Sequence, residues 1–246
     1  MKILLYNIAY GTGAPKTFYK QITNIHNFIR TSHRHIAAIA DFIKETNADI
    51  TGLVEVDTGS YRTSYINQVD TISKSIDAYH HYSIKYGKRS INRKLPILNK
   101  QANAVLTKEK TLGVDYLYFP VGTKRLIIKL AFEKFDFYLL HLALIKSVRK
   151  TQLEYLAEIV DKEKLMIIAG DMNTFAGESE LADIKDKLQL KNPNTNQVPT
   201  YPSWSAKHQL DYILCSNSMS ITKIEVKEIK HSDHFPIVLD VELEHE

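Results

Sequence analysis

The sequence predicts an α/β protein in which two mainly antiparallel sheets pack together and helices cover their outer faces. Short apolar runs typical of strands alternate along the chain with stretches of helical periodicity. Three strand candidates, at 102–107, 125–132 and 135–142, follow one another too closely for helical crossovers, which favours antiparallel pairing. A sandwich of two sheets fits this order better than a doubly wound parallel sheet.

The helix expected at 32–46 shows the helical pattern. Ser32 can cap its N-terminus, and Ile36, Ile39 and Ile43 recur on one face. Further helices are expected, in chain order, at 61–76, 147–161 and 178–188.

The strand candidates are short runs rich in apolar and β-branched residues. The run at 165–169 is wholly apolar and stops at Gly170, and the turn Glu133-Lys134 separates two runs that indicate a hairpin. Strands are expected at 3–6, 49–54, 79–86, 102–107, 125–132, 135–142, 165–169, 210–214, 221–229 and 236–241. The segment 85–100 is the least regular part of the chain.

The composition is that of a globular protein, with 44% hydrophobic and 24% charged residues and only 9 Gly and 7 Pro among 246 residues. A disordered or collagen-like chain is excluded, and a single cysteine excludes a disulfide framework and a cysteine-based zinc site. The net charge of +4 and the pI near 8.9 suit an anionic substrate without requiring one. No Gly-, Ser- or Pro-rich linker divides the chain, so we expect a single domain over residues 1–246.

No apolar run approaches the ~20 residues of a transmembrane helix. The apolar start of the chain is too short for a signal peptide, since the polar Asn7 follows at once. We therefore expect a cytoplasmic protein with no membrane span, and a monomer.

Polar side chains stand at the ends of six strand candidates, where they can reach a shared rim of the sheets. These residues are Asn7, Glu55, His141, Asp171 with Asn173, Asp211, and Asp233 with His234. Buried carboxylates are costly unless they are paired or bind a metal ion, and Mg²⁺ prefers oxygen ligands of this kind. The absence of cysteine ligands and of a His-Glu-x-x-His helix argues against zinc. The pattern thus favours a hard cation such as Mg²⁺, with Mn²⁺ as an alternative.

Each strand end taken alone also has a structural interpretation. Asn7 can be a turn residue, 170–173 can be an Asx turn, and Asp211 can be a charge at a strand edge. It is their occurrence together, in this chain order, that points to a functional site.

In this order, the strand-end residues and the segments 170–173, 210–214 and 232–234 resemble the endonuclease/exonuclease/phosphatase superfamily. That group includes DNase I-like nucleases, exonuclease III-like repair enzymes, inositol polyphosphate 5-phosphatases and neutral sphingomyelinases. The resemblance extends from residue 7 to about 240. It implies a four-layer α/β/β/α sandwich, a Mg²⁺-dependent site and hydrolysis of a phosphate ester.

The resemblance also implies which residues would bind the metal and the substrate. Glu55 would hold the metal directly, and Asn7 and Asp233 would support the metal or its waters. Asn7 would also lie against the substrate. The basic segment 85–100, with six Lys or Arg and no acid, offers Lys85 and Arg89 as phosphate-binding residues, although a solvated loop is an equally simple interpretation of that segment.

The catalytic roles implied by the resemblance fall on five residues. Asp171 would orient and activate the attacking water, and Asn173 would fix Asp171 or a phosphate oxygen. His234, oriented by Asp211, would bind or protonate the phosphoryl group. His141 would donate to the phosphate or to the leaving oxygen.

One departure bears on the substrate. In the nuclease branch, the acidic partner of His141 is expected near 80–86, and no acid stands there. We therefore favour a phosphodiesterase or phosphatase acting on a nucleotide or phospholipid-type substrate, with a DNA endonuclease or exonuclease as the alternative. A non-catalytic phosphate-binding module and a nucleic-acid-binding protein without hydrolysis are alternatives of other classes.

Overall fold

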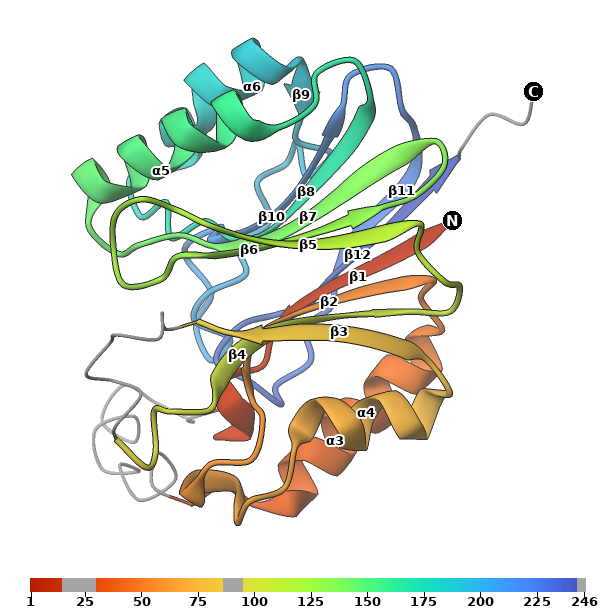
Figure 1. Ribbon diagram of the computed structural model, residues 1–246, viewed down its shortest axis with the longest axis vertical. Coiled ribbons are helices and arrows are strands. Elements are labelled where there is room, and N and C mark those ends of the chain that lie inside the picture. The colour runs from red at the N-terminus through yellow and green to blue at the C-terminus, as the bar shows by residue number, and fades with distance from the viewer. Residues whose placement is uncertain (15–29, 86–94, 243–246) are drawn as a thin grey trace.

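The computed structural model describes residues 1–14, 30–85 and 95–242 of the chain. Figure 1 shows four layers, with two sheets in the middle and helices on both outer faces. Helices α5 (Lys146–Ile159) and α6 (Ala182–Leu188) cover one sheet, and α3 (His33–Thr46) and α4 (Gln68–Ile76) cover the other. The expected α/β/β/α sandwich is confirmed.

Among the described residues, each sheet has six strands with one parallel pair, β1–β2 in the first sheet and β7–β8 in the second. In spatial order the first sheet is β11 (Ser220–Val226), β12 (Ile237–Glu242), β1 (Lys2–Asn7), β2 (Ile50–Asp57), β4 (Gln101–Thr107) and β3 (Tyr79–Ile84). The second is β5 (Gly113–Tyr118), β6 (Leu126–Ala131), β7 (Phe135–His141), β8 (Leu165–Asp171), β10 (Asp211–Ser216) and β9 (Leu190–Lys191). The other neighbouring strands pair antiparallel.

The strand directions bring particular strand ends to one rim of each sheet. Parallel β1 and β2 end on the same side, as do β7 and β8, where His141 lies in register with Asp171. Strands β10 and β12 run antiparallel to β8 and β1, so their first residues face the same rim. By the same rule the end of β3 and the start of β6 lie there, because β6 is antiparallel to β7 and β3 runs in the direction of β2.

The two sheets pack through a shared apolar core. Leu5 of the first sheet and Phe137, Leu139 and Ile167 of the second are fully buried in it. Each such side chain contributes ~1.5–3 kcal/mol relative to an exposed one. Because this core draws on both halves of the chain, it supports our proposal that residues 1–246 form one domain.

The helices pack on the outer faces as their periodicity predicts. In α3, Ile39 and Ile43 are buried against Leu4 and Leu53 of the first sheet. The side chain of Ser32 accepts a hydrogen bond from the backbone N–H of Arg34 and caps the helix, as expected. No helix in the described parts of the chain is both long enough and apolar enough to cross a membrane.

Several elements differ from expectation, among them the two-residue strand β9, which was not expected. The helix expected at 61–76 begins only at Gln68, because Asn67 caps it by accepting from the N–H of Val69 at 3.0 Å, and Tyr61–Thr63 form a separate 3₁₀ turn. The helix expected at 178–188 likewise starts as a 3₁₀ turn before α6. Strand β5 was not expected, since it lies at a sheet edge with much of its length exposed and lacks a strong apolar pattern.

Candidate active site

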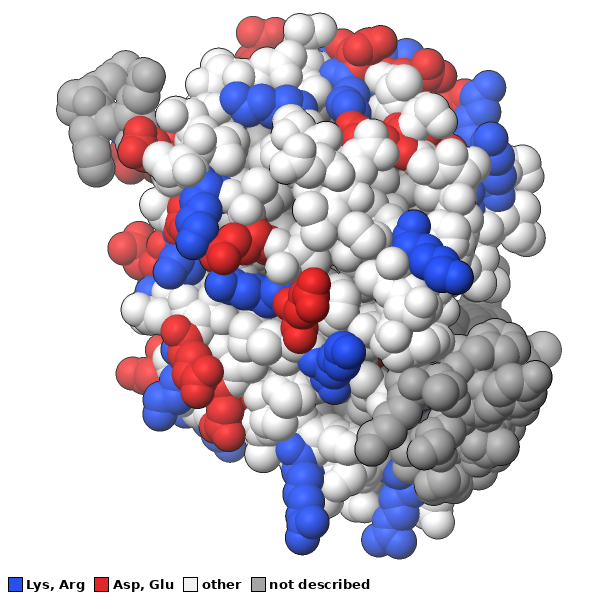
Figure 2. All heavy atoms as spheres, turned by 180° about the vertical axis from the view of Figure 1, so that it is seen from behind, with Lys and Arg blue, Asp and Glu red and all other residues white. Residues whose placement is uncertain are grey.

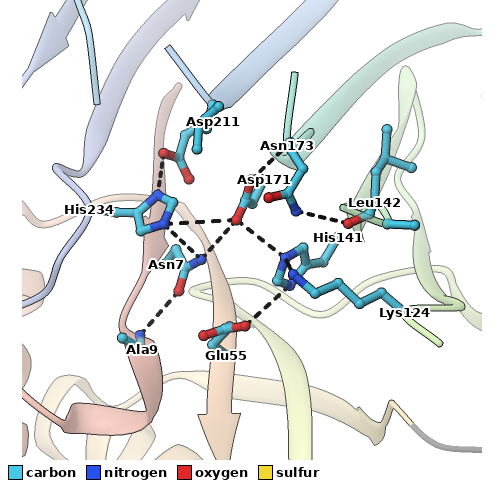
Figure 3. Close-up of polar contacts among 12 residues, drawn as sticks. Asn7, Ala9, Glu55, Lys124, His141, Leu142, Asp171, Asn173, Asp211 and His234 are labelled. Carbon is cyan, nitrogen blue, oxygen red and sulfur yellow. Dashed lines mark hydrogen bonds and ion pairs between the residues drawn. The ribbon is translucent and has the colours of Figure 1, made fainter. Parts of the chain in front are cut away.

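Side chains from six strands, most of them at or beside a strand end, point toward one another between the two sheets (Figure 3). They are Asn7 at the end of β1, Glu55 in β2, His141 at the end of β7, Asp171 at the end of β8, Asp211 at the start of β10, and His234 just before β12. All except Glu55, whose side chain is 19% exposed, are buried. Such a concentration of buried polar groups requires mutual pairing.

Asp171 lies at the centre and links the two sheets. Its Oδ2 accepts a hydrogen bond from Asn7 Nδ2 at 3.0 Å, and it lies 3.2 Å from His141 Nε2 and 3.9 Å from His234 Nε2. Its Oδ1 accepts from the backbone N–H of Asn173 at 3.0 Å. Burial alone would raise the pKa of Asp171, but His141 and His234 outweigh it and hold the pKa well below its usual range. Asp171 is therefore an ionised carboxylate.

The backbone beside Asp171 is shaped to place it. A Cβ on Gly170 would lie 2.0 Å from the carbonyl oxygen of Leu140 in β7, so glycine is needed for this close approach of the strands. Asn173 adopts a left-handed conformation with φ of 51°, which asparagine tolerates well, and its Nδ2 donates to Leu142 O at 2.8 Å. The turn after β8 is thus held from both sides.

His234 forms an ion pair with Asp211, whose Oδ2 lies 2.7 Å from His234 Nδ1. Thr200 Oγ1 donates to the same oxygen at 2.6 Å. Burial would lower the pKa of His234, but Asp211 first, then Asp171 and Asp233, raise it to about 10. The imidazole is therefore a cation at neutral pH, with Nδ1 facing Asp211 and Nε2 facing Asp171.

Glu55 is turned into the site by an irregularity in β2. The pairing register of β2 with β4 shifts between Leu53 and Val56, and Glu55 takes a left-handed φ of 59°. Its N–H donates to Asn103 Oδ1 at 3.2 Å, which gives the displaced backbone a partner. Holding a non-glycine residue in this conformation costs on the order of 1–3 kcal/mol.

Two lysines lie on the Glu55 side of the site. Lys85, at the end of β3, is only 3% exposed, donates to the hydroxyl of Tyr10 at 2.8 Å and lies 3.5 Å from Glu55 Oε1. Burial would raise the pKa of Glu55, but Lys85 and Lys124 lower it to about 2. Burial also lowers the pKa of Lys85, to about 8.

Lys124 contacts His141 directly, through Nζ and Nε2. Burial, and then the charge of Lys124, lower the pKa of His141 to about 4, so this imidazole is neutral at pH 7. Its Nδ1 is buried 3.8 Å from Glu55 Oε1 and has no hydrogen-bond partner among the described residues. The described strand β3 brings no acid to it, in line with the departure noticed in the sequence.

Asp233 lies beside this group. Ser232 Oγ, which donates to the backbone oxygen of Asn7 at 2.8 Å, also lies 3.2 Å from Asp233 Oδ1. Burial raises the pKa of Asp233, and the charges of Glu55 and Asp171 raise it further. Asn7 Oδ1 accepts from the N–H of Ala9 at 3.1 Å, which fixes the amide orientation.

The chemistry of these donors fits a hard cation. Asp171, Asp211 and His234 offer ligand atoms within 4.8 Å of one another and could hold a metal ion. Glu55 and Asp233 add two carboxylates to the site. The charge of Asp171 raises the pKa of Glu55, and the charges of Glu55 and Asp171 both raise the pKa of Asp233. A divalent cation between these carboxylates would relieve that repulsion.

The structure therefore brings together the sequence-predicted residues Asn7, Glu55, Lys85, His141, Asp171, Asn173, Asp211, Asp233 and His234. Arg89 lies outside the described residues. Sequence reasoning missed Lys124 and Tyr10. The strand-end pattern could have found Lys124, since it stands two residues before β6.

Comparison with known proteins bears on this site. The model of the Endonuclease/Exonuclease/phosphatase family matches residues 5–234. Among solved structures, the fold is similar to an endonuclease/exonuclease/phosphatase from Beutenbergia cavernae DSM 12333, with TM-score 0.74 and 15% identity over 99% of this chain and 71% of that chain. It is also similar to a mannosyl-6-phosphatase from Bacteroides thetaiotaomicron VPI-5482, with TM-score 0.69 and 16% identity over 99% and 100%. A third similar structure is the human Nocturnin catalytic domain with a bound sulfate. Its TM-score is 0.71 and its identity is 17%, over 98% of this chain and 93% of that chain.

A search of curated proteins finds no significant match. The four-layer sandwich with acids, amides and imidazoles at one rim defines a DNase I-like class of proteins, whose fold these structures share. The chain belongs to the Endonuclease/Exonuclease/phosphatase family. Members of this family are generally phosphoester hydrolases.

Proposed function

We propose that this protein is a Mg²⁺-dependent hydrolase of a phosphate ester. The observation that carries the proposal is the buried ion pair of His234 and Asp211 beside the ionised Asp171. These groups provide a proton donor and a base within one site. Ester hydrolysis needs such groups together, because a water must lose a proton while the leaving oxygen gains stabilisation.

Asp171 is proposed as the group that orients and activates the attacking water, by accepting a hydrogen bond from it. Its carboxylate stays ionised, and Asn7 and the N–H of Asn173 fix both of its oxygens. Asn173 thus acts through its backbone on Asp171, and we propose that its side chain, whose Nδ2 donates to Leu142 O, holds the turn that positions Asp171.

His234 and His141 are proposed to act on the phosphoryl group in different ways. His234 is held as a cation by Asp211, so it can donate a full proton or bind a charged phosphoryl oxygen. His141 is neutral, so it can donate a hydrogen bond to the phosphate or to the leaving oxygen but carries no charge. Lys85 and Lys124 add positive charge on the same side.

The donor set supports a Mg²⁺ ion held by Glu55, with Asn7 and Asp233 assisting, and Mn²⁺ could replace it. Such an ion would offset the negative charge that develops on the phosphoryl oxygens. His234 is a poor ligand for a second cation, because it is already protonated and paired with Asp211.

We propose a nucleotide or phospholipid-type ester as the substrate, handled by a cytoplasmic monomer. A DNA endonuclease or exonuclease is the alternative within the family. The face in Figure 2 shows basic and acidic side chains interspersed, with a broad uncharged area between them.

The test is a panel of phosphate esters assayed with Mg²⁺, Mn²⁺ and EDTA. The panel contains plasmid, abasic duplex, single-stranded DNA, phosphoinositides, sphingomyelin, nucleoside and sugar monophosphates, and bis-p-nitrophenyl phosphate. We expect turnover that EDTA abolishes, and a loss of ~10³-fold in Glu55→Gln if the metal supplies several kcal/mol. A matched control is Glu225→Gln, at an exposed ion pair on β11. Binding without turnover, insensitive to EDTA, would instead indicate a phosphate-binding module.

A further inference from the structure

Four aromatic side chains gather beside His234, and we call them the aromatic platform: Phe175, Tyr201, Trp204 and His208. Tyr201 packs against the His234 ring, with centroids 4.8 Å apart. Phe175 meets Tyr201 edge to face at 6.2 Å and His208 at 5.5 Å, and Trp204 meets Tyr201 at 6.3 Å. The platform is therefore continuous with the candidate active site.

The backbone of the platform is tied to the residues of the site. Tyr201 and His208 exchange two backbone hydrogen bonds of 2.9 Å, which closes the loop between them. Ser203 N donates to the backbone oxygen of Asp233 at 2.7 Å, and Ser203 Oγ donates to that of Ser232 at 2.6 Å. These bonds fix the platform against the segment that carries His234, so little ordering is needed when a ligand binds.

The platform is exposed where a packed core cluster would be buried. Phe175 is 43% exposed and follows Asn173 by two residues, His208 is exposed, and Tyr201 and Trp204 are half-buried. Edge-to-face packing leaves ring faces open, and a group of apolar rings that borders a polar site is typical of a ligand-binding surface.

We propose that the aromatic platform binds the base of a nucleotide-type substrate, with the ester phosphate at Asp171 and His234. This inference rests on the proposed function and narrows its substrate. In Figure 3, His234 lies on one side of Asp171, and His141 with Lys124 lies on the other. The platform, packed on His234, and the lysines thus divide the site into a ring-binding side and a charged side.

A nucleobase suits the platform because its flat face stacks on aromatic rings and its polar edge can meet the imidazole of His208. Stacking of one base on aromatic side chains changes affinity by about fivefold to a hundredfold. Stacking on the platform would therefore select the ring of the substrate. The phosphate group, which all phosphate esters share, would bind at the site in the same way for each of them.

The experiment uses Trp204, the one tryptophan of the chain, as a fluorescent reporter inside the platform. AMP and ribose 5-phosphate, which differ only by the base, are titrated into the Glu55→Gln protein, where turnover is slow. We expect AMP to quench Trp204 and to bind about tenfold tighter than ribose 5-phosphate. Adding Phe175→Leu should remove that preference without changing ribose 5-phosphate affinity. Tyr116→Leu, at an exposed ring on β5, should change neither.

Equal binding of AMP and ribose 5-phosphate, absence of AMP binding at millimolar concentration, or equal weakening of both by Phe175→Leu would overturn the proposal. Tight binding of glucose 6-phosphate that Phe175→Leu abolishes would assign the platform to a sugar ring and overturn it as well. Turnover of esters without preference for a base would refute the base-binding role of the platform and support the hydrolase proposal. Binding of AMP with the expected preference, but without turnover of any ester in the panel, would support the base-binding platform and refute the hydrolase proposal.

Discussion

Replacing Asp211 with Asn removes the charge that keeps His234 protonated. The substitution preserves side-chain size and an acceptor for Thr200, so the pocket keeps its shape. Asp211 is the largest of the charges that raise the pKa of His234 to about 10. In the variant, burial lowers that pKa, and the more distant Asp171, at 3.9 Å, opposes it less.

The size of the effect follows from the contact that is lost. The 2.7 Å bond between His234 Nδ1 and Asp211 Oδ2 is buried and charge-assisted, and bonds to charged groups contribute ~1.5–3 kcal/mol. If that stabilisation serves the transition state, kcat/KM at pH 7 falls by about 10- to 150-fold, since ~1.4 kcal/mol corresponds to tenfold.

The assay is the pH dependence of kcat/KM, together with the NMR titration of the His234 ring. The wild-type protein should stay active above pH 7 for as long as His234 remains protonated. The Asp211→Asn variant should lose activity as the pH rises through neutrality. Because the folded pKa exceeds the ordinary 6.5, the stability contributed by protonated His234 is complete below pH 6.5 and is lost as pH rises through about 10. A loss by the same factor at every pH, with unchanged ring titration, would refute this reasoning.

Three further predictions concern the turn after β8, an ion-paired carboxyl away from the site, and Lys124. Gly170→Ala places a Cβ 2.0 Å from a backbone oxygen and should destabilise the protein by ~1–3 kcal/mol or more in denaturant melts, whereas Gly113→Ala, with its nearest neighbour at 3.9 Å, should not. Burial would raise the pKa of Asp136, but two lysines lower it. Asp136→Asn should therefore lose ~1–3 kcal/mol at pH 7 and keep activity, and the difference should vanish as acid protonates the wild-type carboxyl. Lys124→Met should raise the pKa of His141, as measured by NMR titration, and weaken phosphate binding. An unchanged titration of His141 would contradict the contact between Lys124 and His141.

The sequence shows the features that depend on neighbours along the chain. Helical periodicity located α3, and Ser32 marked its start, because capping and face formation are local. Asn7, Asp171 and Asp211 stood out for the same reason, since each adjoins an apolar strand. Where the local signal was weak, prediction failed, as at the exposed edge strand β5 and at the start of α4, which the cap at Asn67 decides.

The tertiary structure alone decided which strand ends share the rim. Asn7 bonds to Asp171 across 164 residues of sequence, and that contact exists because two six-stranded sheets pack face to face. Strand order and direction then bring Lys85 and Lys124 beside Glu55 and His141, and the sequence alone does not show these two contacts. Pairing between distant segments sets this geometry, so the charges that tune each pKa follow from the fold.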